Sequence, residues 1–436
     1  MSKFISPQFP CHTILRHLNS TMSKPVSANL PETLKTEAVP EDQSVARSVH
    51  YSLFRTVEAA GKDWDLAAPA NDLFMQRRYL GILEQNPPEG MRFGYLVFYT
   101  GHDPIGVAII QIKNFRGDAN IQELNAADKE TNFFDGISKW MKRGVAGFLT
   151  ADILICGNLL LTGPHAFYFD PQKISHEQAL LELEKSLKGA IKQLEQKPVK
   201  IPVILFKDIQ PEDQTSAKTL KKKSFVEFQI QPNMVMPLPY RNFDAYLGAM
   251  STKYRTRAKR AFKKAEGIRK HEMSLSDIQQ ELPRIYQLYK DIANNAGFNM
   301  LDLNKDYLLA LKRDFADHYR MVGYYIDDKL VAFYTTIRNH HELEAHFLGY
   351  DKLMNHEYQL YLNILYDIIR TGIEGEASEI VFARTALEIK SSVGAVAHDL
   401  NCYVRYENRI INHLTRPLLE YLKPVEEWLP RHPFKE

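Results

Sequence analysis

The stretch MVGYYIDDKLVAFYTTI, residues 321–337, together with the residues that follow it up to 383, is the part of the chain that best predicts the fold. Two segments rich in β-forming residues, 321–326 and 330–337, flank the polar turn at 327–329 and predict a hairpin. Further elements are predicted in chain order: a strand at 344–348, a helix at about 358–373 ended by Gly372 and Gly375, and a strand at 379–383. An antiparallel meander that leads into a helix and a further strand is typical of α+β domains with a mixed sheet.

The first half of the chain shows a similar order of elements. A hairpin is predicted at 93–113, apolar strand segments at 151–156 and 158–161, an amphipathic helix at 175–196 and a buried strand at 201–206. Ser175 and Gln178 predict a capping box at the start of that helix. The similar order of elements in the two halves therefore predicts that one domain has been duplicated. The alternative is that this order is simply common among α+β domains.

The domain limits follow from composition. Residues 1–45 are rich in Pro, Ser and Thr and predict a disordered tail. The alternative is an organelle presequence, and Met22 is a possible start in place of Met1. A cluster of prolines near residue 238 predicts a boundary between a first domain at 46–238 and a second at 239–436.

A strongly basic segment opens the second domain. Helices are predicted at 243–267 and 282–295, and the first has one apolar face, made of Tyr254, Ala258, Ala261, Phe262 and Ala265. Its other faces form a cationic stripe that includes Lys253, Arg255, Arg257, Lys259 and Arg260. Such a stripe attracts phosphates. The alternative is an ordinary solvated face.

The length, net charge, cysteine positions and apolar stretches of the chain restrict the classes of function to be considered. The chain has 436 residues and a net charge of +2, which does not indicate nucleic-acid binding, and we expect no specific DNA binding. Cys11, Cys156 and Cys402 form no close pair, which fits a reducing compartment, so a cytoplasmic protein is expected. We expect no transmembrane segment, because the most apolar stretch, 148–161, is too short.

Three segments of the second half resemble the Fem-type branch of the GNAT superfamily, which comprises tandem-GNAT acyl- and aminoacyltransferases related to peptidoglycan biosynthesis. They are the basic helix at 251–260, the hairpin segment at 327–332, and the segment FARTALEIK at 382–390 with Val393-Gly394-Ala395 behind it. The resemblance implies two GNAT-like domains, each a mixed, mainly antiparallel sheet flanked by helices. It also implies acyl or aminoacyl transfer from an activated carrier to an amine.

The resemblance also implies site residues. In Fem-type enzymes the lysine after the last core strand contacts the reacting groups, and Lys390 matches it. We expect Lys390 and Arg384 to stabilise or orient a carbonyl or carboxylate, and His346 to be the candidate base. Tyr350 and Glu388 are expected to contact substrate. The alternatives are a surface Lys390 paired with Glu388, and a packed His346.

The expected partners follow from the same resemblance. They are a phosphate-bearing acyl donor, such as acyl-CoA or another acyl carrier, and a small-molecule or lipid-linked amine acceptor, with no tightly bound cofactor. The stretch 349–358 departs from the family pattern, because it has no glycine after Gly349 to build a pyrophosphate loop. The donor therefore stays open, and a non-catalytic binding module for a phosphate-bearing ligand is the alternative function. The cluster of His340, His341 and His346 lacks a zinc motif, so no metal is expected.

Overall fold

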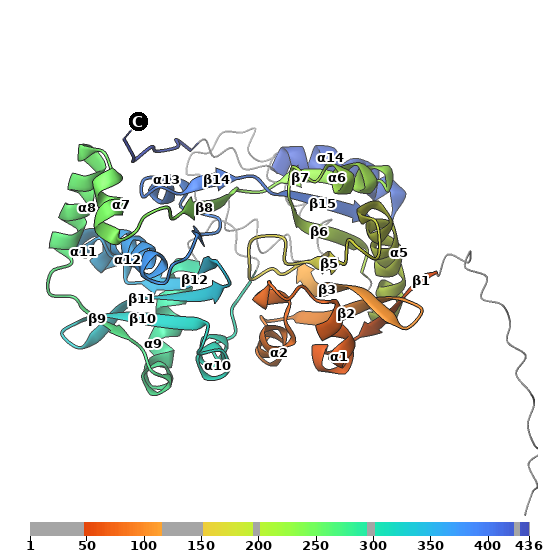
Figure 1. Cartoon of the computed structure of the whole chain (residues 1–436), viewed down its shortest axis with the longest axis horizontal. Coiled ribbons are helices and arrows are strands. Elements are labelled where there is room, and N and C mark those ends of the chain that lie inside the picture. Colours follow the sequence, from red (N-terminus) through yellow and green to blue (C-terminus); the bar gives the residue numbers. More distant parts are fainter. Residues whose placement is uncertain (1–47, 116–150, 195–200, 294–300, 423–427, 436) are drawn as a thin grey trace, which may run out of the picture. The chain divides into compact units, whose positions relative to one another are not determined.

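The computed structural model describes residues 48–115, 151–194, 201–293, 301–422 and 428–435 (Figure 1). The predicted tail at 1–45 and most of the long insertion between residues 113 and 151 lie outside these ranges. The described chain forms two mixed, mainly antiparallel sheets flanked by helices, which confirms the predicted α+β class.

The first sheet is built mainly from the first half of the chain. Its strands lie in the order β1 (Val49–Phe54), β2 (Met91–Thr100), β3 (Asp103–Phe115), β4 (Ala151–Cys156), β6 (Val203–Ile209), β15 (Asn401–Tyr406) and β7 (Val226–Gln229), and β5 (Phe167–Phe169) pairs with β3. Strands β4 and β6 are parallel, with Ile153 opposite Val203, whereas the other described pairs of this sheet are antiparallel.

The second sheet repeats this plan. In the corresponding direction its strands are β9 (Arg269–Glu272), β10 (Tyr319–Ile326), β11 (Lys329–Asn339), β12 (Glu342–Tyr350), β13 (Glu379–Val381), β8 (Asn233–Pro237) and β14 (Val396–His398). Here too one pair is parallel, β12 with β13, at the same position in the order as β4 with β6. The shared order and the shared position of the parallel pair support the predicted duplication.

The two sheets exchange one strand each. β15, from the C-terminal part of the chain, lies between β6 and β7 in the first sheet. β8, which directly follows β7 in the chain, lies between β13 and β14 in the second sheet. Each sheet therefore contains an interior strand from the other half of the chain, a connection that the predicted boundary at residue 238 does not describe.

Helices cover both sheets (Figure 1). Those of the first half and the chain end are α1 (Val57–Ala67), the short 3-10 helix η1 (Leu73–Met75), α2 (Arg77–Gln85), α5 (His176–Leu194), α6 (Gln214–Lys222) and α14 (Arg409–Leu422). Those of the second half are α7 (Phe243–Ala249), α8 (Thr252–Lys264), α9 (Leu275–Ala293), α10 (Tyr307–Asp314), α11 (Lys352–Tyr358), α12 (Leu360–Glu374) and α13 (Leu387–Ser391). One half of the predicted capping box of α5 is confirmed, since Gln178 N donates to Ser175 Oγ at 3.3 Å.

Three predicted elements were wrong in detail. Residues 158–161 form a turn and not a strand, because Gly157 has a φ of 147° and the Asn158 side chain accepts a hydrogen bond from Leu160 N at 3.0 Å. The predicted helix at 243–267 is two helices, α7 and α8, separated at Met250, whose backbone is extended and forms a bridge with Phe434.

The third error concerns the end of α12. Gly375 caps this helix as predicted, but Gly372 lies inside it. A Cβ atom at residue 372 would lie 2.8 Å from the Leu238 side chain and 3.1 Å from that of Ile380. This glycine therefore permits close packing of α12 on the sheet and does not end the helix.

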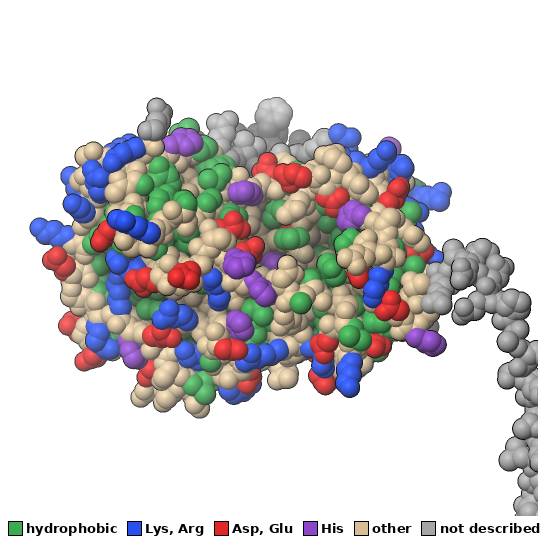
Figure 2. All heavy atoms as spheres, in the orientation of Figure 1, with side chains coloured by type: hydrophobic (Ala, Val, Ile, Leu, Met, Phe, Trp, Pro, Cys, Tyr) green, Lys and Arg blue, Asp and Glu red, His purple; other side chains and the backbone are tan. Residues whose placement is uncertain are grey.

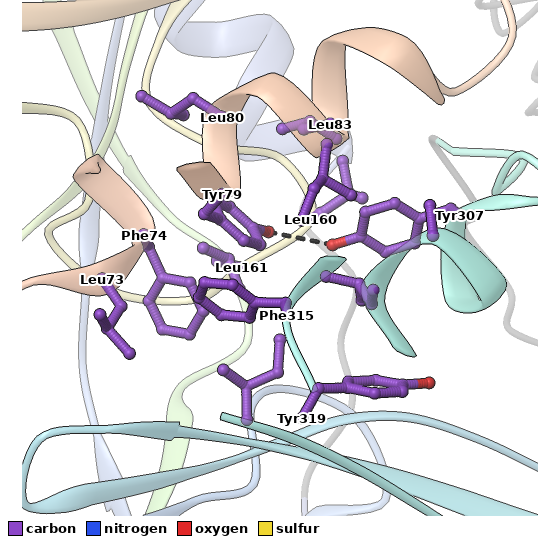
Figure 3. Packing of buried hydrophobic residues seen from close by; sticks show 14 of the residues in the cluster. Leu73, Phe74, Tyr79, Leu80, Leu83, Leu160, Leu161, Tyr307, Phe315 and Tyr319 are labelled. Atoms are coloured by element: carbon purple, nitrogen blue, oxygen red, sulfur yellow. Dashed lines mark hydrogen bonds between the residues drawn. The ribbon is translucent and has the colours of Figure 1, made fainter. Parts of the chain in front are cut away.

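A hydrophobic cluster joins the two halves (Figure 3). Phe74 and Tyr79 from the first half pack with Tyr307, Phe315 and Tyr319 from the second. The Tyr79 hydroxyl forms a 3.1 Å hydrogen bond with the Tyr307 hydroxyl inside this cluster. The two halves thus share a hydrophobic core.

Candidate active site

Three polar side chains alternate along β12 on the face that is turned toward the first half. Leu343 and Ala345 point into the core of the second half, so Glu342 and Glu344 point the other way. His346 continues this row, since its Nε2 forms a 3.0 Å hydrogen bond with the Tyr307 hydroxyl in the shared core. The strand carries one line of ionisable groups at the junction of the two halves.

The sheet opens beside this row. β12 pairs with β13 only from Glu342 to Glu344, opposite Glu379 to Val381. β13 ends there, whereas β12 continues to Tyr350, paired with β11 and irregular near Thr335. Along a strand, every second residue directs its backbone N–H and C=O groups toward the strand on the same side. Beyond Glu344, β13 no longer pairs with β12, so the N–H and C=O groups on that side of β12 are not bonded to β13.

Lys390 lies at this opening, on the short helix α13. Its side chain is buried, with 5% of the residue exposed. Its Nζ donates to the carbonyl oxygens of Arg384 at 2.5 Å and Ala383 at 3.3 Å. Ala383, Thr385 and Ala386 have φ angles of 56°, 70° and 48°. Lys390 thus holds a loop whose backbone occupies the left-handed region, which is costly for residues other than glycine.

The charges of Lys390 and Glu344 are strongly affected by burial. Burial lowers the pKa of Lys390 to about 7, and attraction by Glu344 partly offsets this effect. Glu344 is 4% exposed, and burial and its neighbour Glu342 raise its carboxyl pKa well above the usual range. No ion pair or hydrogen bond of the Glu344 carboxylate is found within the described residues. The buried carboxyl group of Glu344 therefore interacts electrostatically with the buried amine of Lys390, whose pKa is about 7.

Arg384 is bound to the first half of the chain. Its guanidinium donates to Asp208 Oδ1 at 2.5 Å and, through Nε, to Gln231 O at 2.9 Å. Asp208 is fully buried at the end of β6 and also accepts from Lys207 and from Gly163 N. Since Lys390 binds the Arg384 carbonyl oxygen, the structure brings these two predicted residues together, with Arg384 as the link to the first half.

His346 is a member of a hydrogen-bonded chain. Its Nε2 contacts Tyr307, whose hydroxyl in turn contacts Tyr79. Its Nδ1 is buried and has no hydrogen-bond partner in the described part of the chain. Burial lowers the pKa of this imidazole to about 3, so the ring is neutral at physiological pH and a weak proton acceptor.

The other predicted residues have different surroundings. Glu388 is exposed and pairs with Arg431 at 2.9 Å, so the alternative in which it pairs with Lys390 is wrong. Tyr350 ends β12 and lies against the Tyr361 ring, with 5.7 Å between the ring centroids.

The predicted cationic stripe lies on α8, where Lys and Arg side chains gather in Figure 2. Ala258 and Ala261 are buried on its inner face, as predicted. Arg255 reaches Gly248 O at 3.5 Å and Lys253 lies over the Tyr254 ring. None of the five predicted basic residues, Lys253, Arg255, Arg257, Lys259 and Arg260, forms an ion pair within the described ranges. Their charges are therefore available to an anionic ligand.

The start of α12 differs from a free helix N-terminus. The short helix α11 precedes it directly, and Gln359 joins the two with a φ of 49°. Asn355 Oδ1 accepts from Tyr361 N at 2.9 Å, and Asn363 Nδ2 donates to Ala261 O of α8 at 3.0 Å. One early N–H group of α12 is thus already bound inside the protein, which makes this terminus a poor anion site.

Sequence reasoning missed a second histidine site. Asp72, before η1, and His165, in the turn after β4, meet with Oδ2 and Nδ1 2.7 Å apart. They are separated by 93 residues, so no local motif indicates them. In the part of the chain that the structure describes, no cluster of His, Cys, Asp and Glu is arranged to hold a metal ion. None of the helices described there has the length and hydrophobicity needed to cross a bilayer.

Comparisons with known proteins identify a domain family in the second half of the chain. Residues 252–391 match the family model of the acetyltransferase (GNAT) domain. No curated protein gives a significant match. The second half therefore contains a GNAT acetyltransferase domain. The relationship to GNAT acyltransferases that the three sequence segments predicted is confirmed.

Solved structures that match part of this chain were also found, and the three that follow are 9–12% identical in sequence. FemX is 12% identical and has a TM-score of 0.48, with 77% of this chain and 97% of that chain covered. A tandem GNAT protein from the clavulanic acid biosynthesis pathway is 9% identical, with a TM-score of 0.49 and 83% and 99% covered. L-PGS from Bacillus licheniformis is 12% identical, with a TM-score of 0.42 and 78% and 95% covered.

Proposed function

We propose that this chain transfers an acyl or aminoacyl group from an activated carrier to an amine, at the opening between β12 and β13. The observation that supports this best is the buried Lys390, which lies at that opening under the influence of Glu344. Attack of an amine on an ester or thioester carbonyl creates an oxyanion. A fixed cation or backbone N–H group that meets this oxyanion lowers the barrier.

Lys390 contributes in two ways, as a cation that stabilises the oxyanion and as an acid that gives a proton to the leaving group. Burial lowers its pKa to about 7, which brings proton transfer within the neutral pH range. Arg384 acts as a positioning residue, because its backbone carbonyl binds Lys390 while its side chain binds Asp208. His346, with its low pKa and unpaired Nδ1, suits a hydrogen-bond contact to substrate better than proton removal.

The carrier is proposed to bear phosphate, with acyl-CoA as the first candidate, and the acceptor to be a small-molecule or lipid-linked amine. The unpaired basic side chains of α8 support a phosphate contact. Because the start of α12 is partly satisfied by Asn355, we place this contact on α8 and not on the helix terminus.

A thermal-shift titration with coenzyme A and a series of acyl-CoAs tests the donor. A ligand at a hundredfold over its Kd should stabilise the folded chain by about 2.7 kcal/mol. Lys259→Glu combined with Arg260→Glu should abolish the shift. The matched control is Lys218→Glu with Lys222→Glu on α6, a basic surface in the first half, which should keep it.

Turnover is measured in the same samples as thiol release in the presence of an amine. Lys390→Met keeps most of the side-chain volume and should retain the thermal shift while lowering turnover at least about 100-fold. Full activity of Lys390→Met would overturn its assigned role. Absence of both shift and thiol release with every acyl-CoA would overturn the choice of a thioester donor.

A further inference from the structure

The Asp72–His165 pair differs from the other His–Asp contacts among the described residues. His176–Asp213, His271–Asp277 and His318–Asp317 are surface pairs in which a carboxylate meets Nε2, and the histidine side chains are 33–47% exposed. In the Asp72–His165 pair the carboxylate meets Nδ1, and the side chains are only 17% and 10% exposed. Burial of such a pair carries a desolvation cost that a surface pair does not have.

The contact fixes the orientation of the imidazole. Asp72 is itself held in place, because its Oδ1 accepts from Phe74 N at 3.0 Å and lies 3.4 Å from Asn339 Nδ2. The Phe74 ring packs edge-on against His165 at 4.9 Å between centroids. A carboxylate on Nδ1 favours the tautomer with the proton on Nδ1. Nε2 is then left as the basic nitrogen.

Nε2 of His165 is left without a protein partner. Within the described ranges no hydrogen bond to it is found, although the ring is nearly buried. Gly163 keeps the space next to it open, since a Cβ atom at residue 163 would lie 3.1 Å from Nε2. Nε2 is therefore an oriented nitrogen for which the described residues supply no partner, beside a position that carries no side chain.

Glu342 lies near this pair, because it is the register partner of Asn339, whose side chain contacts Asp72. Glu342 and Glu379 are register partners on the parallel strands β12 and β13, an arrangement that is unfavourable for like charges. The pKa of Glu342 is raised by burial and by Glu379, with Asp72 adding to this effect and His165 and His340 opposing it. A cationic group bound here would relieve that repulsion. The local chemistry therefore fits a protonated amine.

We propose that His165, oriented by Asp72, is the general base for the amine acceptor, and that Glu342 binds the acceptor's ammonium group. This inference rests on the acyl transfer proposed above and specifies its acceptor as a primary amine that arrives protonated. The active site is then composite. The first half supplies the base, and the second half supplies Lys390 and the acidic strand β12.

The distances along β12 suit this division of roles. Glu342 and Glu344 are two residues apart on one face, which corresponds to about 7 Å along a strand. Glu344 in turn acts electrostatically on Lys390. An acceptor amine near Glu342 and a donor carbonyl near Lys390 would thus lie within the span of one short row.

The proposed reaction starts with the acceptor in its protonated form. The ammonium group of the acceptor gives one proton to His165 Nε2 and becomes a free amine. The amine nitrogen attacks the carbonyl carbon of the ester or thioester donor, the C–N bond forms, and the C–O or C–S bond breaks. The leaving alkoxide or thiolate takes a proton from Lys390, and the nitrogen loses its second proton to solvent as the amide forms.

The test compares two acceptors with the acyl-CoA that gives the largest thermal shift. Ethylamine is almost fully protonated at neutral pH and needs a base, whereas hydroxylamine is largely unprotonated and does not. His165→Gln should lower kcat/KM for ethylamine about 100-fold or more, the usual contribution of general base catalysis. It should change kcat/KM for hydroxylamine by less than about threefold, because no proton has to be removed first.

Two further variants sharpen the result. Asp72→Asn, which removes the orienting charge but keeps an acceptor oxygen, should show the same selective loss for ethylamine. His271→Gln removes a surface His–Asp pair and should leave both rates unchanged. Equal losses for both acceptors in His165→Gln, or no loss for either, would overturn the inference while leaving acyl transfer intact. A wild-type protein inactive with both acceptors would overturn the proposed function and this inference with it.

Discussion

At the scale of single residues, the structure buries ionisable groups where loss of hydration destabilises their charged forms. Lys390 and Glu344 are each at most 5% exposed, and burial shifts both pKa values toward the neutral form. Shifts of this kind gather at functional sites. A stable protein keeps such groups only where the surrounding structure offsets the cost, as the two carbonyl contacts of Lys390 do.

The depressed pKa of Lys390 predicts a pH dependence of stability. Below pH 7 the lysine is protonated in both folded and unfolded chains, so the full cost of burying the charge is present. Between pH 7 and about 10.4, the ordinary lysine value, the unfolded chain binds more protons. The contribution of this residue to the free energy of unfolding therefore rises with pH across that window.

Denaturant unfolding of wild type and Lys390→Met at pH 7 and pH 9.5 measures this contribution. The difference between the two free energies of unfolding should move in favour of wild type at the higher pH, by up to a few kcal/mol, since one pKa unit corresponds to about 1.4 kcal/mol. A difference independent of pH would show that the ammonium of Lys390 is not desolvated.

At the scale of elements, a short C-terminal segment decides how the second domain begins. Phe434 bridges Met250, where α7 ends, and its ring packs on Tyr240, Tyr246 and the backbone at Gly394. Pro433 O accepts from Ser251 N, directly before α8. The break between α7 and α8, which the apolar pattern did not predict, therefore depends on residues far along the chain.

Phe434→Ala should lower the free energy of unfolding by about 2 kcal/mol, less than for a fully buried phenylalanine because the ring is half-buried. Arg431→Ala is the matched control in the same segment. Its pair with Glu388 joins two side chains that are 42% and 48% exposed, so its loss should cost at most about 0.5 kcal/mol. Equal effects of the two changes would contradict the structural role of the Phe434 ring.

At the scale of the whole described part of the chain, the exchange of strands makes the two domains depend on each other. β15 lies inside the first sheet and β8 inside the second. Tyr403 of β15 is fully buried in the core of the first half. Removing an interior strand leaves two neighbouring strands with unpaired backbone groups, which is far more costly than losing an edge strand.

A chain divided between residues 238 and 239 should therefore not give two independently folded domains, because the first fragment then lacks β15 and the second lacks β8. The fragments 47–238 and 239–436, expressed separately, should each lack protected amide protons in most of their strands by hydrogen exchange. Mixed after joint refolding, they should recover that protection. Two separately folded fragments with protected sheets would contradict the interdependence and would support the predicted boundary near 238 as a true domain limit.

Sequence patterns among neighbouring residues were enough to predict many of the secondary-structure elements of this protein. The turn at 327–329, the capping of α5 by Ser175 and the apolar face of α8 are contacts between near neighbours, and their patterns predicted the elements correctly. The order of these elements and three short segments also identified the GNAT acyltransferase class. Among the site residues, Lys390 and Arg384 could be named because they lie within one contiguous segment, although their roles stay predictions.

The remaining features follow only from the tertiary structure, because they join residues that lie far apart in the sequence. The Asp72–His165 pair, the Arg384–Asp208 contact and the strand exchange join residues 93 to about 200 positions apart, and no periodicity in one segment indicates its partner in another. Burial is decided in the same way. The sequence shows Lys390 and Glu344 as ordinary charged residues, and only the packing of the two halves around β12 removes them from water and shifts their pKa values.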